Sequence, residues 1–174
     1  MADNILLSGP PGCGKTTIIK DVLKQLKGIK AGGFHTSEIR EGGVRKGFKI
    51  TSLDGREAIL SHIDFKGPFR VSKYGVSIEN LESIGLRAIQ DAIQYADIIV
   101  IDEIGKMELF SENIRNAILA ALDSPKKVLG TIMMASNPFT DQIKKRKDVS
   151  IVEVERKEQE KALNEILEAI KIRA

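Results

Sequence analysis

Hydrophobic residues near the start of the chain change from a continuous run to a helical spacing. Ile5 to Leu7 is a short apolar run that ends in a turn rich in glycine and proline, which is typical of a buried parallel strand. From Thr16 to Lys27 apolar side chains recur every three or four residues, and Gly28 follows as a natural helix stop. This pattern predicts a strand, a loop and a helix.

The next segment has the period of two that is typical of strands. It extends from Phe34 to His62, and Gly42-Gly43 and Asp54-Gly55 favour the tight turns of hairpins. We therefore expect two linked antiparallel hairpins, inserted at about residues 33–63 between units of strand and helix.

Strand and helix patterns alternate again in the rest of the chain. Apolar residues from Leu81 to Ile93 have a helical spacing, and Ile98 to Ile101 form a second buried strand that ends at Asp102-Glu103. The remaining elements are a helix at 111–122, a strand at 128–133, a short helix from 137, a strand at 151–154, and a closing helix with a buried face of Leu163, Ile166, Leu167 and Ile170. This order predicts a three-layer α/β fold, in which helices cover both faces of a mostly parallel sheet.

Length and composition narrow the class of protein. A chain of 174 residues with 42% hydrophobic residues fits one domain over residues 1–174. The longest apolar run has six residues, far below the roughly 18 of a membrane span, and the single cysteine fits a reducing compartment, so we expect a cytoplasmic protein. A net charge of +3 and only eight aromatic residues argue against a nucleic-acid-binding surface, and nothing in the sequence identifies a protein partner.

One motif carries specific chemistry. Residues 9–16 match G-x-x-x-x-G-K-[ST], the phosphate-binding loop, and they lie between the predicted strand and helix as that motif requires. Backbone N–H groups and a helix N-terminus converge there, which favours phosphate oxygens. We expect Lys15 to reach the β- and γ-phosphates as a catalytic residue, and the Thr16 hydroxyl to bind Mg²⁺. The predicted nucleotide contacts are Gly9, Pro10, Pro11, Gly12, Cys13, Gly14, Lys15, Thr16 and Thr17.

An acidic pair follows the second buried strand. A carboxylate at the position of Asp102 is costly to bury without a cation, and Mg²⁺ beside the phosphates would be that cation. Glu103 follows directly and suits the activation of an attacking water. We therefore expect Asp102 to be a metal residue and Glu103 to be catalytic.

Several segments together resemble a known family. Ile101 to Leu109 reads IDEIGKMEL and Gly33 to Arg40 reads GFHTSEIR; with the phosphate loop, they are similar to the THEP1-type, or cancer-related, nucleoside-triphosphatases. The resemblance implies a RecA-like P-loop fold and slow, Mg²⁺-dependent hydrolysis of several nucleoside triphosphates, with diphosphates used less well. We also count Asp102, Glu103, Ile104 and Gly105, within this motif, as nucleotide contacts. Relatives usually carry Asn-Arg-Asp after the last strand where this chain reads ERKE over residues 155–158, which leaves base preference open.

Other residues have weaker claims. Phe34, Thr36, Glu38 and Arg40 share one strand face, which is either the wall of a site or a solvated edge. Lys106 either stabilises charge on the transferred phosphoryl group, as a catalytic residue, or is a surface lysine. An arginine that completes the site is not identified among Arg40, Arg45, Arg70 and Arg87.

The sequence supports three functional hypotheses. The first is hydrolysis of ATP, GTP, CTP and UTP or TTP to diphosphate and phosphate, with Mg²⁺ as cofactor and little discrimination between bases. The second is a small nucleoside or nucleotide kinase, because kinases use the same phosphate loop. The third is a nucleotide-dependent switch that binds a partner protein.

Overall fold

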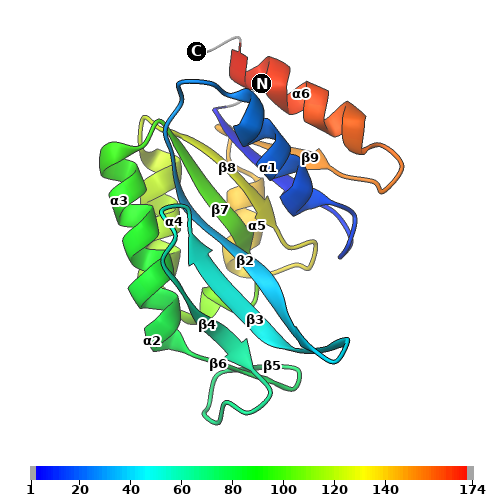
Figure 1. Cartoon of the computed structure of the whole chain (residues 1–174). Helices are drawn as coiled ribbons and strands as arrows, with labels where there is room; N and C mark the ends of the chain where they lie inside the picture. The colour runs from blue at the N-terminus through cyan, green and yellow to red at the C-terminus, as the bar shows by residue number, and fades with distance from the viewer. Residues whose placement is uncertain (1–2, 172–174) are drawn as a thin grey trace.

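One continuous sheet of nine strands runs through the protein (Figure 1), in the order β5-β6-β4-β3-β2-β7-β8-β1-β9. The structure is a computed structural model that describes residues 3–171. Five neighbouring strands, from β2 to β9 in this order, are parallel, and the others are antiparallel. The strands are β1 (Asn4–Ser8), β2 (Ala31–Glu41), β3 (Val44–Ser52), β4 (Glu57–His62), β5 (Arg70–Val71), β6 (Tyr74–Val76), β7 (Ile98–Ile104), β8 (Lys127–Ile132) and β9 (Val149–Glu153).

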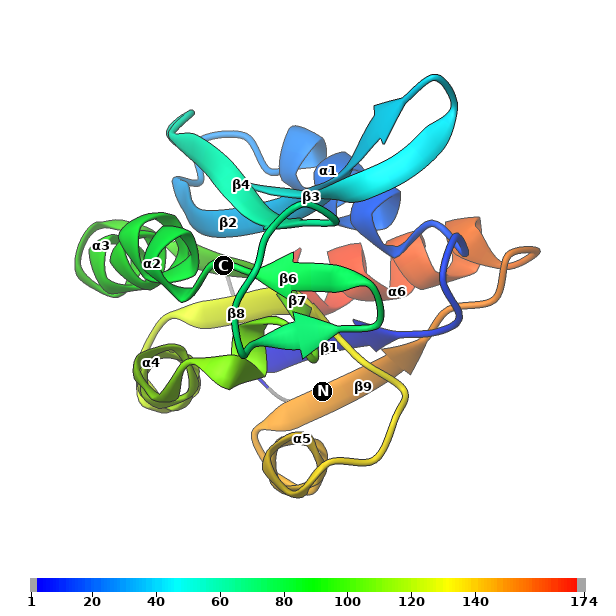
Figure 2. The same cartoon turned by 90° about the horizontal axis from the view of Figure 1, so that it is seen from below.

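Helices pack on both faces of the parallel part of the sheet (Figure 2), so the predicted three-layer α/β fold is confirmed. Alternate residues of β1 point to the two faces: Ile5 and Leu7 contact α1 and α6, while Leu6 belongs to the core beneath α3 and α4. The helical segments are α1 (Lys15–Gln25), α2 (Ile78–Asn80), η1 (Leu81–Leu86), α3 (Arg87–Tyr95), η2 (Glu108–Phe110), α4 (Glu112–Asp123), α5 (Pro138–Lys144) and α6 (Gln159–Lys171).

The long strand β2 joins the two parts of the sheet. Its first residues, from Ala31 to His35, pair in parallel with β7, and Phe34 to Glu41 pair with β3 in antiparallel register. The backbone of Gly33 passes so close to β7 that a Cβ there would lie 1.9 Å from the carbonyl oxygen of Val100. The two predicted hairpins are therefore present, and they extend the central sheet.

Two features differ from the sequence prediction. A small hairpin of β5 and β6 adds two strands at one edge of the sheet, and the sequence did not predict them. These strands are too short to show a hydrophobic period. The predicted helix over 81–93 contains a π-helical segment, η1, before α3 begins. Gly85 of η1 lies against the core, where a Cβ would be 3.0 Å from the side chain of Ile50. The π-helical segment thus lies where Gly85 approaches Ile50 of β3. The spacing of apolar residues does not distinguish a π-helix from an α-helix.

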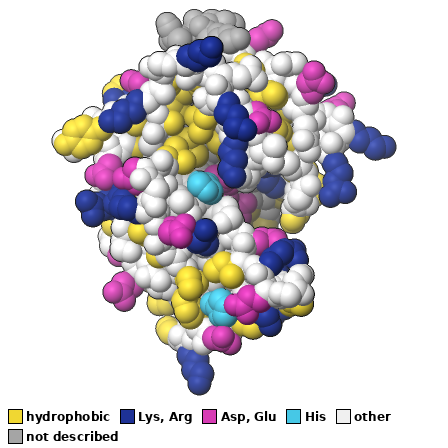
Figure 3. Space-filling view, in the orientation of Figure 1, with side chains coloured by type: hydrophobic (Ala, Val, Ile, Leu, Met, Phe, Trp, Pro, Cys, Tyr) yellow, Lys and Arg dark blue, Asp and Glu magenta, His cyan; other side chains and the backbone are white. Residues whose placement is uncertain are grey.

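Within residues 3–171, no helix has both the length and the apolar character needed to cross a bilayer. On the face shown in Figure 3, basic and acidic side chains are interspersed.

Candidate active site

The loop between β1 and α1 forms a cradle of backbone groups at the carboxyl end of β1. Gly14 is the N-cap of α1 with a φ of +95°, a conformation that other residues rarely adopt. The N–H groups of the first helical turn point toward the loop, and Gly14 has no side chain that could accept a hydrogen bond from them. Together with the helix dipole, these groups favour an anion at this point.

Lys15 is folded over the loop. Its Nζ donates hydrogen bonds to the carbonyl oxygens of Gly9, at 2.6 Å, and Pro10, at 3.2 Å. These acceptors are weaker partners for an ammonium group than phosphate oxygens, because phosphate carries a full negative charge. The lysine is therefore held beside the cradle in a position from which it can exchange carbonyls for phosphate.

Asp102 connects three elements beneath the cradle. The Thr16 hydroxyl donates a hydrogen bond to Oδ2 at 2.7 Å, and the Thr131 hydroxyl of β8 donates one to Oδ1 at 2.7 Å. Asp102 is only 4% exposed, and the pairing of β7 with β8 shifts between Ile101 and Ile104, where the acidic pair lies. The buried carboxylate thus has a hydroxyl on each oxygen, one of them from the phosphate loop.

Two further carboxyl groups lie close to Asp102. Burial and the charge of Asp102 raise the pKa of Glu103, while Lys15 opposes the shift. Glu108 is 4% exposed, and burial, followed by the charge of Glu103, raises its pKa to about 8. Glu108 is therefore mostly protonated at neutral pH. A Cβ on Gly105 would lie 2.6 Å from Oε1 of Glu103, so glycine leaves room for that carboxylate.

The sequence pattern does not identify Glu108 as a site residue. The only local indication is an acidic residue between two apolar residues, Met107 and Leu109, and many surface glutamates have such neighbours. The tertiary structure identifies it, because η2 buries the Glu108 side chain close to Glu103 and Asp102 at the end of β7.

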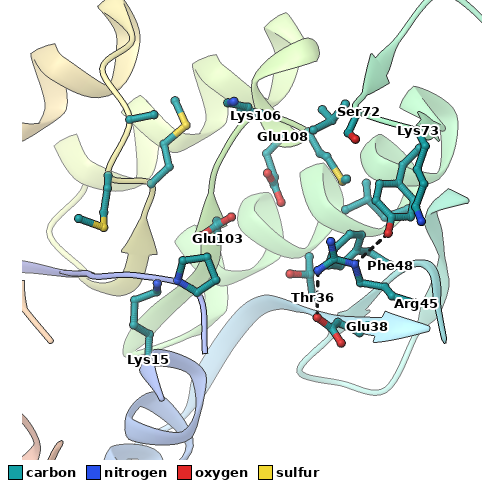
Figure 4. A pocket seen from close by; sticks show the side chains of 18 of the residues that line it. Lys15, Thr36, Glu38, Arg45, Phe48, Ser72, Lys73, Glu103, Lys106 and Glu108 are labelled. Atoms are coloured by element: carbon teal, nitrogen blue, oxygen red, sulfur yellow. Dashed lines mark hydrogen bonds and ion pairs between the residues drawn. The ribbon is translucent and has the colours of Figure 1, made fainter. Parts of the chain in front are cut away.

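A cavity of about 750 Å³ extends from the cradle toward the hairpins (Figure 4). Lys15 and Glu103 lie at one end, and Arg45, Phe48 and Lys73 lie at the other. The lining residues come from the phosphate loop, from the strands β2 to β7, from the turn between β5 and β6, and from the segments after β7 and β8. They are Gly9, Pro11, Lys15, Thr36, Glu38, Arg40, Val44, Arg45, Phe48, Leu60, Val71, Ser72, Lys73, Tyr74, Glu103, Lys106, Met107, Glu108, Met133, Met134 and Ala135.

The predicted residues of the phosphate loop, the acidic pair and Lys106 divide into three groups. The cavity is lined by Gly9, Pro11, Lys15, Glu103 and Lys106. A hydrogen bond joins the two predicted metal residues, Thr16 and Asp102. The other loop residues do not line the cavity: Pro10, Gly12 and Thr17 are exposed, Gly14 is half-buried, and the Cys13 side chain is buried against the core.

The structure does not bring Ile104 and Gly105 to the cavity. Ile104 is fully buried in the core, and Gly105 packs against Glu103. Ile104 is the last residue of β7, and its side chain points into the core.

The sequence is similar to known nucleoside-triphosphatases over nearly its whole length. Residues 4–167 match the family described as NTPase. A nucleoside-triphosphatase THEP1 from Thermotoga sp. (strain RQ2) is 49% identical over 167 residues, which cover 96% of this chain and 95% of that protein. The chain therefore belongs to the NTPase family, which includes the THEP1 nucleoside-triphosphatases. THEP1 of Methanocaldococcus jannaschii is 40% identical over 172 residues, covering 96% of this chain and 99% of that one.

Solved structures of the THEP1 family have the same fold. The crystal structure of THEP1 from Aquifex aeolicus superposes with a TM-score of 0.86 at 31% identity and covers 95% of this chain and 98% of its own. The solution structure of a human cancer-related nucleoside triphosphatase gives a TM-score of 0.84 at 34% identity, with 98% of both chains covered. The P-loop NTPase fold expected from the sequence is therefore confirmed.

The segment in which this member of the THEP1 family departs from the Asn-Arg-Asp pattern lies over the phosphate loop. Arg156 Nη2 is 3.4 Å from the carbonyl oxygen of Gly12, and Gln159 Nε2 donates a hydrogen bond to that of Cys13 at 2.7 Å. The connection between β9 and α6 thus forms one side of the cradle, and the cavity forms another.

The four candidate arginines occupy different places in this THEP1-family structure. Arg40 and Arg45 line the cavity, as do Thr36 and Glu38 of the predicted strand face, whereas Phe34 of that face is buried in the core. Arg70 donates hydrogen bonds to the backbone carbonyls of Phe65 and Lys73, and Arg87 pairs with Asp91 on α3. Arg70 and Arg87 are not among the residues that line the cavity.

Proposed function

We propose that this protein hydrolyses nucleoside triphosphates to diphosphate and phosphate, with Mg²⁺ as cofactor and with little preference among bases. The observation that carries the proposal is the hydrogen bond from Thr16 of the phosphate loop to buried Asp102, beside Glu103 in the cavity. The names of the THEP1 relatives support the same reaction.

The loop and Lys15 bind the phosphates. Backbone N–H groups at the start of α1 hold the phosphate oxygens, and Lys15 leaves the carbonyls of Gly9 and Pro10 to contact the β- and γ-phosphates. All four common triphosphates share these groups, so most of the binding energy is independent of the base.

Thr16 and Asp102 fit a magnesium site. Mg²⁺ prefers oxygen ligands and is usually held by one or two protein groups together with water and substrate phosphates. The Thr16 hydroxyl suits direct contact, and Asp102, whose oxygens already accept hydroxyl hydrogen bonds, suits an outer position that holds water. When bound, Mg²⁺ neutralises charge on the β- and γ-phosphates.

Glu103 is the general base of the proposed reaction. It lines the cavity, and its raised pKa makes the carboxylate a better proton acceptor than an exposed glutamate. Glu103 orients a water molecule toward the γ-phosphate and takes its proton, and Lys106, which also lines the cavity, contributes positive charge. Diphosphates lack the γ-phosphate and are expected to react less efficiently.

The test is phosphate release from ATP, GTP, CTP and UTP, and from the matching diphosphates, with Mg²⁺ and with a chelator. We expect release from each triphosphate, and at least a tenfold loss of rate in the chelator. Absence of phosphate release from every triphosphate in Mg²⁺ would refute hydrolysis, and full activity in the chelator would refute the metal requirement.

A further inference from the structure

The segment that joins β9 to α6 lies against the phosphate loop. A Cβ on Gly9 would lie 2.6 Å from the carbonyl oxygen of Val154, and a Cβ on Gly14 would lie 2.7 Å from Cδ of Gln159. Gln159 is the first residue of α6. The side-chain amide of Gln159 thus occupies the space that any other residue at position 14 would need for its side chain.

The Gln159 amide is joined to the loop by one short hydrogen bond. Its Nε2 donates to the carbonyl oxygen of Cys13 at 2.7 Å, although 146 positions separate the two residues in the sequence. Only the NH₂ end of the amide can pair with a carbonyl oxygen, so the partner determines how the amide is oriented. The bond is partly buried, which increases its electrostatic strength relative to a bond in water.

The carbonyl of Cys13 and the N–H of Gly14 belong to the same peptide unit. A hydrogen bond accepted by the carbonyl polarises this unit and makes its N–H a better donor. Within residues 3–171, no backbone carbonyl is paired with the Gly14 N–H. The N–H groups of a phosphate loop are the donors to the phosphates of a nucleotide. Gln159 therefore lies one peptide unit away from a phosphate donor.

We propose that Gln159 is a positioning residue, which holds the peptide unit between Cys13 and Gly14 and strengthens its N–H as a donor to a nucleotide phosphate. The inference rests on the proposed binding of nucleotides at the loop. Gln159 does not touch the phosphate and acts through the peptide unit. The coupling is reciprocal, because a phosphate bound to the N–H makes the Cys13 carbonyl a stronger acceptor for Gln159.

Gln159→Leu and Gln159→Glu remove the donor in two ways. Leucine is uncharged and of similar size, and we expect the Kd for MgADP to rise about three- to tenfold, the equivalent of one hydrogen bond. Glutamate places an acceptor beside the Cys13 carbonyl, and the rise should exceed that of the leucine variant. An unchanged Kd in both variants would overturn the proposal.

Comparison of bases separates an effect on the phosphates from a contact with the base. ADP, GDP and CDP present the same two phosphates to the loop, so each variant at position 159 should weaken all three by the same factor. A loss confined to one of the three would show that the segment before α6 contacts the base. The proposal would then be wrong.

Asn164→Asp is the matched control for charge. Asn164 is exposed on α6, five residues beyond Gln159, so this variant makes the same change from amide to carboxylate on the same helix. The Kd for MgADP should stay at the wild-type value. If Asn164→Asp weakens binding as much as Gln159→Glu does, the general charge of the helix explains the effect, and the proposal is refuted.

Unfolding measurements separate positioning from a purely structural role. A negative side chain is favourable in the first turn of a helix, so glutamate at position 159 offsets part of the lost hydrogen bond. We expect the midpoint of thermal unfolding without nucleotide to change little in Gln159→Glu, and the increase produced by a fixed concentration of MgADP to be smaller than in wild type. An equal decrease of the midpoint with and without MgADP would indicate a structural role alone.

The side-chain amide of Gln159 gives a readout in the wild-type protein, independent of catalysis. In a ¹⁵N–¹H spectrum, the NH₂ signal that disappears in Gln159→Glu belongs to this residue. MgADP should shift that signal saturably, because the bound phosphate strengthens the acceptor to which the NH₂ group donates. A signal that does not move when MgADP saturates the protein would contradict the coupling.

The outcomes distinguish this inference from the proposed hydrolysis. MgADP binding that depends on Gln159, without phosphate release from any triphosphate, would refute the hydrolysis and retain the role of Gln159. Phosphate release with the same MgADP affinity in wild type and in both variants would refute the role of Gln159 alone. Absence of MgADP binding by wild type would refute nucleotide binding at the loop and, with it, both proposals.

Discussion

Three carboxyl groups around the end of β7 have different environments, and these differences suit different roles. Asp102 accepts a hydroxyl hydrogen bond on each of its two oxygens, from Thr16 and from Thr131. Glu103 is half-buried at the cavity with a raised pKa, and Glu108 is buried with a pKa of about 8. The negative charges of Glu103 and Asp102 both raise the pKa of Glu108, so protonation of Glu108 relieves part of the repulsion among the three carboxyl groups.

Glu103→Gln should separate binding from turnover. The amide keeps the size of the side chain but cannot accept a proton from water, so turnover should fall by about 10²–10⁴-fold while nucleotide affinity changes little. Phosphate release and equilibrium binding of a labelled nucleotide measure the two effects. Glu168→Gln, exposed on α6, is the control. Wild-type turnover in Glu103→Gln would remove Glu103 from the mechanism.

Glu108 should make stability depend on pH. Its pKa is higher in the folded protein, about 8, than its ordinary value of 4.5. The folded state therefore binds more protons between these values, and the free energy of unfolding decreases as pH rises through that window. The stabilisation is fully present below pH 4.5 and lost above about pH 8, with a total of at most about 5 kcal/mol.

Glu108→Gln tests this dependence, because glutamine is neutral at every pH. Urea unfolding at pH 5, 6, 7 and 8 should show a flatter profile for the variant, and the variant should gain stability relative to wild type as pH rises. Glu103 also has a raised pKa and contributes a slope of the same sign, which the variant retains. Parallel profiles for the two proteins would show that Glu108 does not titrate in this window.

At the scale of elements, Asp102 links β7 to α1 and β8. Thr16 lies 86 residues from Asp102 in the chain and Thr131 lies 29 residues from it, yet both hydroxyls reach the same carboxylate. The helix that presents the phosphate loop is thus held to the centre of the sheet by a side-chain contact as well as by packing. A change in either hydroxyl is expected to affect both stability and the position of the cradle.

Thr131→Val should destabilise the protein by about 1.5–3 kcal/mol, because the buried carboxylate loses a hydrogen-bond donor while the shape of the side chain is kept. Thr131→Ser retains the hydroxyl and should be less destabilised. The free energy of unfolding from urea titration measures both. Equal stability of Thr131→Val and wild type would indicate that the contact to Asp102 contributes little.

At the scale of the whole molecule, the aromatic residues are unevenly distributed. Ring contacts in the described residues join Phe48 to Tyr74, His62 to Phe65 and Phe69 to Phe110. Residues 154–158, between β9 and α6 beside the phosphate loop, read VERKE and contain no aromatic residue. The side of the cradle opposite the cavity therefore has few means to distinguish one base from another.

Rates of hydrolysis for ATP, GTP, CTP and UTP should accordingly differ by less than about tenfold, equivalent to roughly 1.4 kcal/mol, the scale of one modest contact. The measurement is kcat/KM for each triphosphate under the same Mg²⁺ concentration. A hundredfold preference for one base would show that Arg156 or its neighbours read the base through hydrogen bonds.

Local chemistry was sufficient to predict a large part of this protein. The phosphate loop follows from glycine, lysine and threonine at fixed spacing, because the loop conformation depends on residues within one turn of each other. The hairpin turns at Gly42-Gly43 and Asp54-Gly55, and the acidic pair at the end of β7, are also local features. The helix and strand limits differ from the predicted ones mostly by a few residues, since the apolar period reports burial and not the terminal hydrogen bonds.

Other features depend on contacts between distant segments. The protonation of Glu108, the hydroxyl of Thr131 on Asp102 and the approach of Arg156 to Gly12 each require residues that are brought together by the order of strands in the sheet. The cavity exists because β2 continues from the parallel part of the sheet into the hairpins and carries their side chains toward Glu103. Burial and electrostatic coupling arise from this long-range packing, and no short stretch of sequence contains them.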